Sequence, residues 1–300
     1  HRPIDIRIST FPAVHGEKIV LRILDRDLET IELEKLGFDL ITLEACKELM
    51  GSSAGFFLVV GPTGSGKTST LYGALNYLNS SEKHIITLED PVEYYLDGIT
   101  QGHIHPEAGF TFERGIRALL RQDPDIIMVG EIRDLETADI AIKAAQTGHL
   151  LLSTLHTNSA PETLTRLVNM GIAPYNIASS LLLVIAQRLL RVLCDKCKIK
   201  ETLPDEILLM EGFKKEEIAT LQLYKPGSCS RCTHGYKGRT AIFEMLPITD
   251  EIAHLIMSGA DSLQIAAASE RLGVQSLREA GLEKVRQGTA SLSDLNSTFR

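Results

Sequence analysis

The sequence predicts an α/β fold built on a mainly parallel sheet with helices on both faces. Residues 56–60, 84–88, 126–129 and 150–154 form short, mostly apolar runs, which is typical of strands buried on both faces. Helical stretches separate these runs, and alternating strands and helices indicate a parallel sheet. Polar residues follow each strand directly, and this is where ligands bind in such sheets. We therefore expect a ligand site at the carboxyl edge of the sheet.

The composition is that of a globular protein without a nucleic-acid partner. The chain has 300 residues, a length that suggests about two domains. Hydrophobic residues make up 44% of it, and its formal net charge is −8. Basic residues are dispersed and tryptophan is absent, so no basic and aromatic stripe is present to bind a nucleic-acid strand. The longest apolar run, 181–186, is far shorter than the ~20 residues of a membrane span. We expect a core helix there and no membrane-spanning segment.

The N-terminal residues predict a β-hairpin. Residues 4–10 and 18–24 alternate apolar and polar side chains on either side of a break, as half-buried strands do. We assign residues 1–24 to the last part of a small α+β domain whose earlier part precedes this chain. Arg7 and Arg22 occupy polar strand positions, and a solvated strand face explains them as well as a functional role does.

The remaining residues divide into four segments. Residues 25–35 are charged and lack an apolar pattern, so we expect a linker that permits domain rotation. Residues 36–190 carry the strands and helices of the α/β core. Residues 191–240 contain four cysteines, and residues 241–300 show apolar side chains at helical spacing. The last segment predicts amphipathic helices without chemistry of their own.

A glycine-rich loop follows the first strand of the core and opens a helix. Its residues are Gly61, Pro62, Thr63, Gly64, Ser65, Gly66, Lys67 and Thr68. Strand, loop and helix together are the context in which G-x-x-x-x-G-K-[ST] cradles phosphate. The glycines let backbone N–H groups turn toward one anion, and the helix N-terminus adds partial positive charge. We expect Lys67 at the β- and γ-phosphates of a nucleoside triphosphate and the Thr68 hydroxyl on Mg²⁺.

Carboxylates follow the next two strands of the core. Glu89, Asp90 and Glu93 come after one strand, and Glu131 comes after the other. Hydrolysis of a triphosphate requires a metal ion and a carboxylate that orients water. We assign Glu131 to Mg²⁺, with a simple ion pair to Arg133 as the alternative. Glu93 is the favoured base for activating water, and Glu89 is the second choice.

A histidine and a row of arginines are further candidates. His156 follows the fourth strand, where we expect a γ-phosphate sensor, with a structural histidine as the alternative. Arg114, Arg117 and Arg121 share one helix face at i, i+3 and i+7. This face would stabilise charge near a phosphate site, either in the same chain or in a neighbouring subunit, and an exposed basic stripe is an equal alternative.

The cysteines indicate a metal site in a reducing compartment. Two C-x-x-C pairs place four thiolates in tetrahedral reach of one zinc ion. All four ligands come from the protein, so we expect a closed, structural Zn²⁺ site formed by Cys194, Cys197, Cys229 and Cys232. Cys46 stands alone in a helical pattern, and we expect it in the core.

With these residues in place, the chain resembles the secretion and pilus-assembly ATPases, the hexameric motors of type IV pili and type II secretion. Four boxes of that superfamily occur in order, namely Walker A at 61–68, the aspartate box at 86–93, Walker B at 127–131 and the histidine box at 153–158. The four-cysteine element is similar to that of pilus-extension and type II secretion members. Residues 144–149 and 186–189 look most like those of pilus-assembly members.

This resemblance implies a RecA-like P-loop ATPase domain with Mg²⁺-dependent ATP hydrolysis. Glu93 would be the catalytic base and Glu131 would act with Mg²⁺, while Arg7 and Arg22 would close on the nucleotide. Arg133 joins Arg117 and Arg121 as a nucleotide-binding candidate.

The resemblance also implies a cytoplasmic homo-hexamer at the inner membrane that drives pilin polymerisation through an inner-membrane platform protein. A type II secretion ATPase driving pseudopilus assembly is the alternative. A nucleic-acid translocase is disfavoured by the acidic balance, and a non-hydrolysing regulatory module is disfavoured by the intact lysine, threonine and acids.

Overall fold

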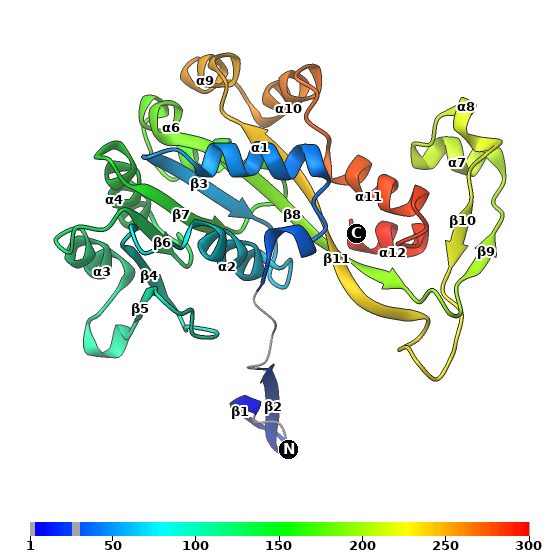
Figure 1. Cartoon of the computed structure of the whole chain (residues 1–300), viewed down its shortest axis with the longest axis horizontal. Helices are drawn as coiled ribbons and strands as arrows, with labels where there is room; N and C mark the ends of the chain where they lie inside the picture. The colour runs from blue at the N-terminus through cyan, green and yellow to red at the C-terminus, as the bar shows by residue number, and fades with distance from the viewer. Residues whose placement is uncertain (1–3, 26–30, 300) are drawn as a thin grey trace.

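The structure, a computed structural model, describes residues 4–25 and 31–299. Its centre is a seven-stranded sheet with the order β11-β8-β3-β7-β6-β4-β5 (Figure 1). Neighbouring strands are parallel except for β11, which is antiparallel to β8. The strands are β3 (Gly55–Val60), β4 (Ile85–Glu89), β5 (Thr100–His103), β6 (Ile126–Val129), β7 (Leu150–Leu155), β8 (Leu181–Leu193) and β11 (Tyr236–Pro247). The predicted α/β fold with a mainly parallel sheet is confirmed.

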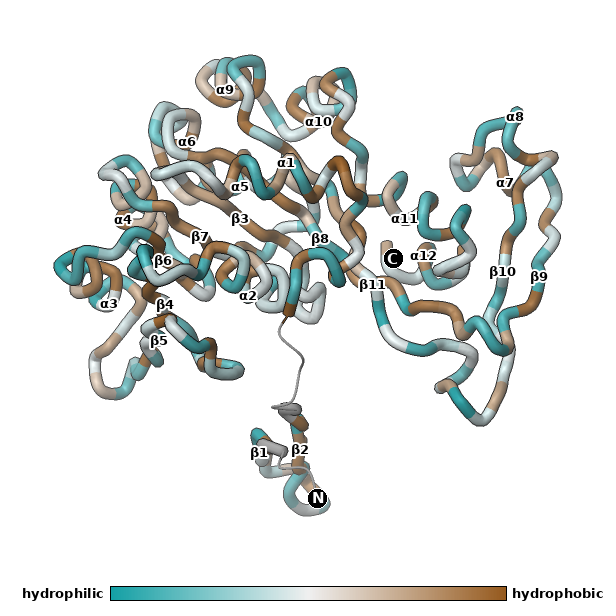
Figure 2. The backbone as a smooth tube through the Cα atoms, viewed as in Figure 1, coloured by the Kyte–Doolittle hydropathy of each residue, from teal (hydrophilic) through white to brown (hydrophobic). Residues whose placement is uncertain are grey.

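Strand side chains alternate between two apolar cores, one on each face of the sheet. On β3, Phe56 and Leu58 enter one core and Phe57 enters the other. Helices α1 (Leu40–Met50) and α2 (Lys67–Leu78) cover the core that contains Phe57. The opposite core is covered by α3 (Phe112–Leu119), α4 (Leu135–Gln146), α5 (Ala160–Asn169), α6 (Pro174–Ser180), α9 (Asp250–Met257), α10 (Ser262–Arg271), α11 (Leu277–Arg286) and α12 (Leu292–Thr298). Figure 2 shows mostly hydrophobic residues, coloured brown, along the central strands, as burial on both faces requires.

Residues 181–186 are a strand, and the expectation of a core helix was wrong. They begin β8, which pairs in parallel with β3, so that Leu58 lies opposite Val184. A short apolar run suits a buried strand and a buried helix equally, because periodicity does not separate the two. Strand β11 also differs from the expected division of the chain, since it crosses residue 240 and completes the edge of the sheet.

The predicted N-terminal hairpin is present. Strands β1 (Ile4–Ala13) and β2 (Gly16–Asp25) pair antiparallel, with Arg7 directly opposite Arg22. This hairpin forms its own two-stranded sheet and does not extend the seven-stranded one. Residues 1–3 of the predicted N-terminal segment lie outside the described residues.

The predicted linker is only partly described. Residues 26–30 lie outside the described part of the chain, and the residues that follow include the short 3-10 helix η1 (Leu33–Lys35). Leu33 is buried in the core beneath α2. A second 3-10 helix, η2 (Pro106–Ala108), follows β5. None of the helices within 4–25 and 31–299 has the length and hydropathy to cross a bilayer.

The cysteine-containing segment forms an arm beside the C-terminal helices (Figure 1). The arm consists of β9 (Ile199–Glu201), α7 (Asp205–Glu211), α8 (Lys215–Ile218) and β10 (Leu223–Lys225). Two ion pairs join it to α11: Arg278 Nη2 lies 2.5 Å from Glu211 Oε2, and Arg286 Nε lies 2.8 Å from Glu217 Oε2. These partly buried pairs attach the arm to the body of the protein.

Candidate nucleotide site and cysteine cluster

One cavity of about 690 Å³ lies at the carboxyl edge of the sheet. A cavity of this size suits a small-molecule ligand. The predicted site residues that line it are Thr63, Gly64, Ser65, Gly66, Lys67, Thr68, Glu89, Glu93, Glu131, Arg133 and His156, together with Arg7 and Arg22 of the hairpin. Segments from four strand ends thus meet at one place, as the positions of the polar residues predicted.

The phosphate loop has the backbone geometry that its glycines permit. Gly61 has φ +153°, and a Cβ there would lie 2.6 Å from the carbonyl oxygen of Gln187. Gly66 has φ +89° and precedes α2, whose first residue is Lys67. A side chain at either position would strain the backbone or strike β8, so these two positions require glycine. The first residues of α2, Lys67, Thr68 and Ser69, line the cavity, which therefore lies at a helix N-terminus.

The Lys67 ammonium is held at the loop. Its Nζ donates to the carbonyl oxygens of Gly61 at 2.8 Å and Pro62 at 3.0 Å. Burial lowers the pKa of Lys67, the negative charge of Glu131 opposes this shift, and the positive charge of Arg188 adds to it. A buried cation beside backbone N–H groups is the arrangement that binds phosphate oxygens.

Glu131 is the centre of a charged cluster at the end of β6. Its Oε1 accepts a 2.5 Å hydrogen bond from Arg133 Nη2, and its Oε2 lies 3.4 Å from His156 Nε2. Arg133 Nη2 is also 3.6 Å from Asp90 Oδ2. Burial opposes ionisation of Glu131, but Arg133 and His156 outweigh it and lower the pKa of the carboxyl. The ion pair considered as the alternative role of Glu131 is present, and Glu131 lines the cavity as well.

Hydroxyl groups on β7 hold its end against the loop that carries Glu131. Ser153 Oγ donates to the carbonyl of Val129 at 2.6 Å, and Thr154 Oγ1 donates to that of Gly130 at 2.8 Å. Downstream, Arg188 Nη2 on β8 donates to the backbone oxygen of Asn158 at 3.2 Å and to its side chain at 3.1 Å. The segment with His156 is therefore fixed to the strands on both sides.

The two candidate bases have different surroundings. Glu89 is only 3% exposed, and it accepts hydrogen bonds from Thr87 Oγ1 at 2.6 Å, from Gln101 Nε2 at 3.0 Å and from the Tyr72 hydroxyl. Glu93 is partly exposed and lines the cavity. Within the described residues, the Glu93 carboxylate has no hydrogen bond or ion pair. Of these two candidates, Glu93 is thus the one whose carboxylate is without such contacts in the described part of the chain.

Two predicted nucleotide-binding arginines lie elsewhere on the chain. Arg117 Nη2 is 3.1 Å from Glu113 Oε1, and Arg121 Nη1 donates to the carbonyl of Arg117 at 2.9 Å. Both line a separate hollow with Asp139 and Lys143. They do not reach the cavity of their own chain, so a role toward a neighbouring subunit's nucleotide and an exposed basic stripe both stay open as predictions. Arg121 lies beyond the end of α3, so the prediction that it shares a helix face with Arg117 was wrong.

The cavity also contains residues that the sequence did not indicate. Leu189 on β8 and Arg239 on β11 line it, although neither belongs to a phosphate-binding motif. Arg239 follows Gly238, which has φ +84°, where the pairing of β11 with β8 shifts register. Only the pairing of β8 with β3 and β11 brings these side chains to the phosphate loop, so no local signal marked them.

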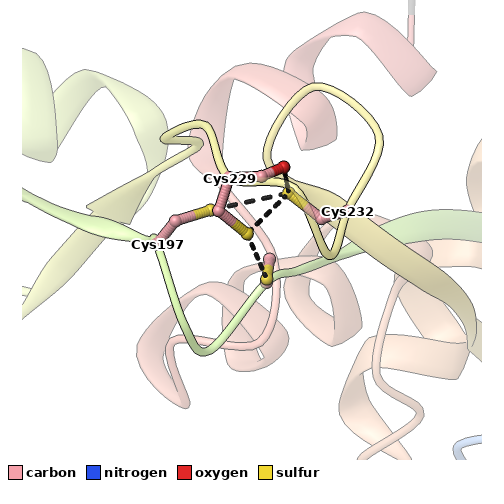
Figure 3. A group of neighbouring side chains, drawn as sticks. Cys197, Cys229 and Cys232 are labelled. Atoms are coloured by element: carbon pink, nitrogen blue, oxygen red, sulfur yellow. Dashed lines mark hydrogen bonds between the residues drawn. The ribbon is translucent and has the colours of Figure 1, made fainter.

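The four predicted zinc ligands meet at the base of the arm, where Figure 3 labels Cys197, Cys229 and Cys232. Their sulfur atoms all lie within 4.8 Å of one another. Sγ of Cys194 is 3.8 Å from Sγ of Cys229, and Sγ of Cys197 is 3.6 Å from Sγ of Cys232. Zn–S bonds of about 2.3 Å in a tetrahedron separate sulfurs by about 3.8 Å, so these thiols can hold one zinc ion. Cys46 is buried away from them, and burial raises the pKa of its thiol to about 12.

The fold and the cavity define a P-loop nucleotide-binding protein with a four-cysteine cluster. The family model for "Type II/IV secretion system protein" matches residues 1–297, and the chain belongs to this family. The resemblance inferred from the sequence motifs is therefore confirmed.

Relatives within the family include pilus and secretion proteins. The chain is 52% identical over 297 residues to the type IV pilus assembly ATPase PilB of Acinetobacter baylyi, covering 98% of this chain and 51% of the relative. It is 48% identical over 296 residues to the type II secretion system ATPase E of Vibrio cholerae, covering 98% of this chain and 58% of the relative. The chain thus spans about half the length of these curated relatives.

A solved structure has the same architecture. The pilus retraction motor PilT with bound ADP superposes with a TM-score of 0.71 at 30% sequence identity, covering 98% of this chain and 73% of that chain. The ATPase DotB of Legionella pneumophila superposes with a TM-score of 0.70 at 22% identity, which supports the fold alone.

Proposed function

We propose that this chain is the ATP-hydrolysing part of a motor that drives pilin polymerisation in type IV pilus assembly. The observation that carries the proposal is the meeting of the phosphate loop, Glu93, Glu131 and His156 in one cavity. The 52% identity to a pilus assembly ATPase favours this cellular role. The 48% identity to a type II secretion ATPase makes pseudopilus assembly the second candidate.

The donor atoms at the cavity fit a magnesium ion. Mg²⁺ prefers oxygen ligands from one or two side chains together with phosphates and waters, and the Thr68 hydroxyl and the Glu131 carboxylate are such donors. When bound, the ion would neutralise charge on the triphosphate. To bind the ion, Glu131 would give up part of its contact with Arg133.

The side chains of the cavity divide the chemistry of hydrolysis among them. Backbone N–H groups of the loop and the Lys67 ammonium would bind the phosphate oxygens. The unpaired Glu93 carboxylate would orient the attacking water and accept its proton. His156, held beside Glu131, would contact the γ-phosphate. We infer that the nucleotide carries an adenine base because the relatives are named as ATPases.

The motor would act as a cytoplasmic homo-hexamer. Arg7 and Arg22 are paired across the hairpin and line the same cavity, so a movement of the hairpin would bring or withdraw positive charge at the phosphates. Arg117 and Arg121 would serve a neighbouring subunit's nucleotide. The work would pass to an inner-membrane platform protein, which would place the motor peripherally at that membrane.

Phosphate release from ATP tests the proposed activity. Lys67→Ala removes the cation that contacts the phosphates, so turnover should fall below detection while the fold, measured by circular dichroism, is retained. Persistent hydrolysis in this variant would contradict the assignment of the site. A folded wild-type chain that binds ATP without releasing phosphate would instead favour a regulatory nucleotide-binding module.

A further inference from the structure

A buried tyrosine joins the helix of the phosphate loop to both candidate bases. Tyr72 lies on α2, and its side chain is 0% exposed. Its hydroxyl donates a hydrogen bond to Glu89 Oε2 and accepts one from the backbone N–H of Glu93 at 3.3 Å. The Tyr72 hydroxyl therefore donates to the last residue of β4 and accepts from the segment that follows this strand.

Glu89 is the fixed end of this arrangement. Its other oxygen, Oε1, accepts from Thr87 Oγ1 at 2.6 Å and from Gln101 Nε2 at 3.0 Å. Three neutral donors thus satisfy a carboxylate that is almost entirely buried, and Tyr72 is the one donor to Oε2 among the described residues, so losing it would leave that buried oxygen unpaired. The hydroxyl hydrogen of Tyr72 therefore points toward Glu89. This leaves the phenol oxygen free to accept a hydrogen bond from the backbone N–H of Glu93.

Burial supports the same assignment of donor and acceptor. Burial raises the pKa of Tyr72, and the negative charge of Glu89 raises it further. The phenol is therefore protonated and neutral at neutral pH, where it can donate to Glu89.

We propose that Tyr72 is a positioning residue for Glu93: its hydroxyl holds the Glu93 backbone so that the carboxylate projects into the phosphate cavity. The proposal rests on the proposed function, in which Glu93 is the base. Lys67 and Tyr72 belong to the same helix, so the cation that binds phosphate and the base that activates water share one rigid support. Glu89 acts in this scheme as an anchor rather than as a second base.

Tyr94 provides a matched control. Its ring meets that of Tyr72 edge-on, with centroids 4.5 Å apart and planes at 75°. The Tyr94 hydroxyl is buried, yet it has no hydrogen-bond partner in the part of the chain that the structure describes. Tyr94→Phe therefore removes a buried hydroxyl without breaking a bond, whereas Tyr72→Phe keeps the ring and breaks two.

The test compares wild type, Tyr72→Phe and Tyr94→Phe by amide hydrogen exchange without nucleotide, read at Glu93 by NMR. It then compares their rates of phosphate release with ATP and Mg²⁺. In Tyr72→Phe the Glu93 amide should exchange about tenfold faster or more, since local opening no longer breaks that bond. The value of kcat should fall about tenfold to a hundredfold, because a small misplacement of a catalytic group costs that much. The KM for ATP should change by less than about threefold, because the phosphate loop is intact.

Each outcome supports or overturns the proposal. Unchanged exchange at Glu93 in Tyr72→Phe would overturn it, as would equal losses of kcat in Tyr72→Phe and Tyr94→Phe. A parallel loss of kcat and ATP affinity would indicate a general structural role and would also overturn it. If Tyr72→Phe does not fold, exchange of the Glu93 amide in the wild-type protein tests the proposal. Unprotected exchange there would exclude the hydrogen bond between the Glu93 N–H and the Tyr72 hydroxyl and would overturn the proposal. The exchange experiment needs no hydrolysis, so an inactive wild type would count against the proposed function while exchange still tests the role of Tyr72.

Discussion

The Thr70 hydroxyl donates a 2.7 Å hydrogen bond to Oε1 of Gln187. Thr70 lies in the first turns of α2, and Gln187 lies on β8, 117 positions later in the chain. Gln187 is 1% exposed, and its backbone oxygen also lies against Gly61 of the phosphate loop. The bond therefore seats the helix of the phosphate loop on a strand that carries none of the recognised nucleotide-binding residues.

Thr70→Val should lower the free energy of unfolding by about 1–3 kcal/mol, because it leaves a buried oxygen of Gln187 without its donor. Valine keeps the shape of threonine, so packing changes little. Urea denaturation of wild type and variant measures the difference. Thr220→Val, at an exposed position, is the control and should change stability by less than about 0.5 kcal/mol. Equal losses in the two variants would show that the bond to Gln187 contributes nothing specific.

Glu93→Gln should retain ATP binding and lose at least about a hundredfold in phosphate release, because a general base contributes about that much. Glu89→Gln should keep measurable turnover, since this carboxylate is occupied by three donors. ATP affinity by titration and kcat by phosphate release distinguish the two effects. Activity in Glu93→Gln together with inactivity in Glu89→Gln would mean that the base is misassigned.

Arg133→Met should lower stability at pH 7, and the difference from wild type should shrink in acid. The pKa of Glu131 lies below its ordinary value of 4.5 because Arg133 and His156 outweigh its burial. A lowered carboxyl pKa stabilises the fold above pH 4.5, and this stabilisation is lost as pH falls through the native pKa. Thermal unfolding from pH 7 to about pH 3.5 measures the difference in Tm. A difference in Tm that stays constant over this pH range would exclude this mechanism.

The purified protein should carry about one zinc ion per chain, as a closed four-thiolate site predicts. Cys194→Ser and Cys229→Ser should each reduce the zinc content and expose the arm to proteolysis, while the central sheet stays folded. Metal analysis and limited proteolysis check both expectations. Cys46→Ala is the control, because Cys46 lies on the buried face of α1 and not in the cluster. The zinc content of this variant should equal that of wild type. If protein produced in zinc-containing medium carries no zinc after purification, the result would count against the four-cysteine zinc site.

The sequence alone determined the features that depend on local order along the chain. The phosphate loop could be predicted because its glycines, lysine and threonine are consecutive and lie between a strand and a helix. The meeting of Glu93, Glu131 and His156 could be predicted because parallel strands bring their carboxyl ends to one edge. The cysteine cluster could be predicted because each C-x-x-C pair is recognised from its local spacing, and two such pairs supply the four ligands of one zinc site.

The tertiary structure alone decided the features that depend on pairing between distant segments. Residues 181–186 became a strand because they lie between β3 and β11, where backbone groups on both sides need partners. Glu89 and Glu93 have the same appearance in the sequence, as strand-end acids, and their surroundings differ largely because Tyr72 and Gln101 reach Glu89 from other elements. Arg239 enters the cavity, and Arg117 stays outside it, for the same reason. Periodicity and spacing describe one segment at a time, whereas burial and hydrogen-bond partners are set by the segments that pack against it.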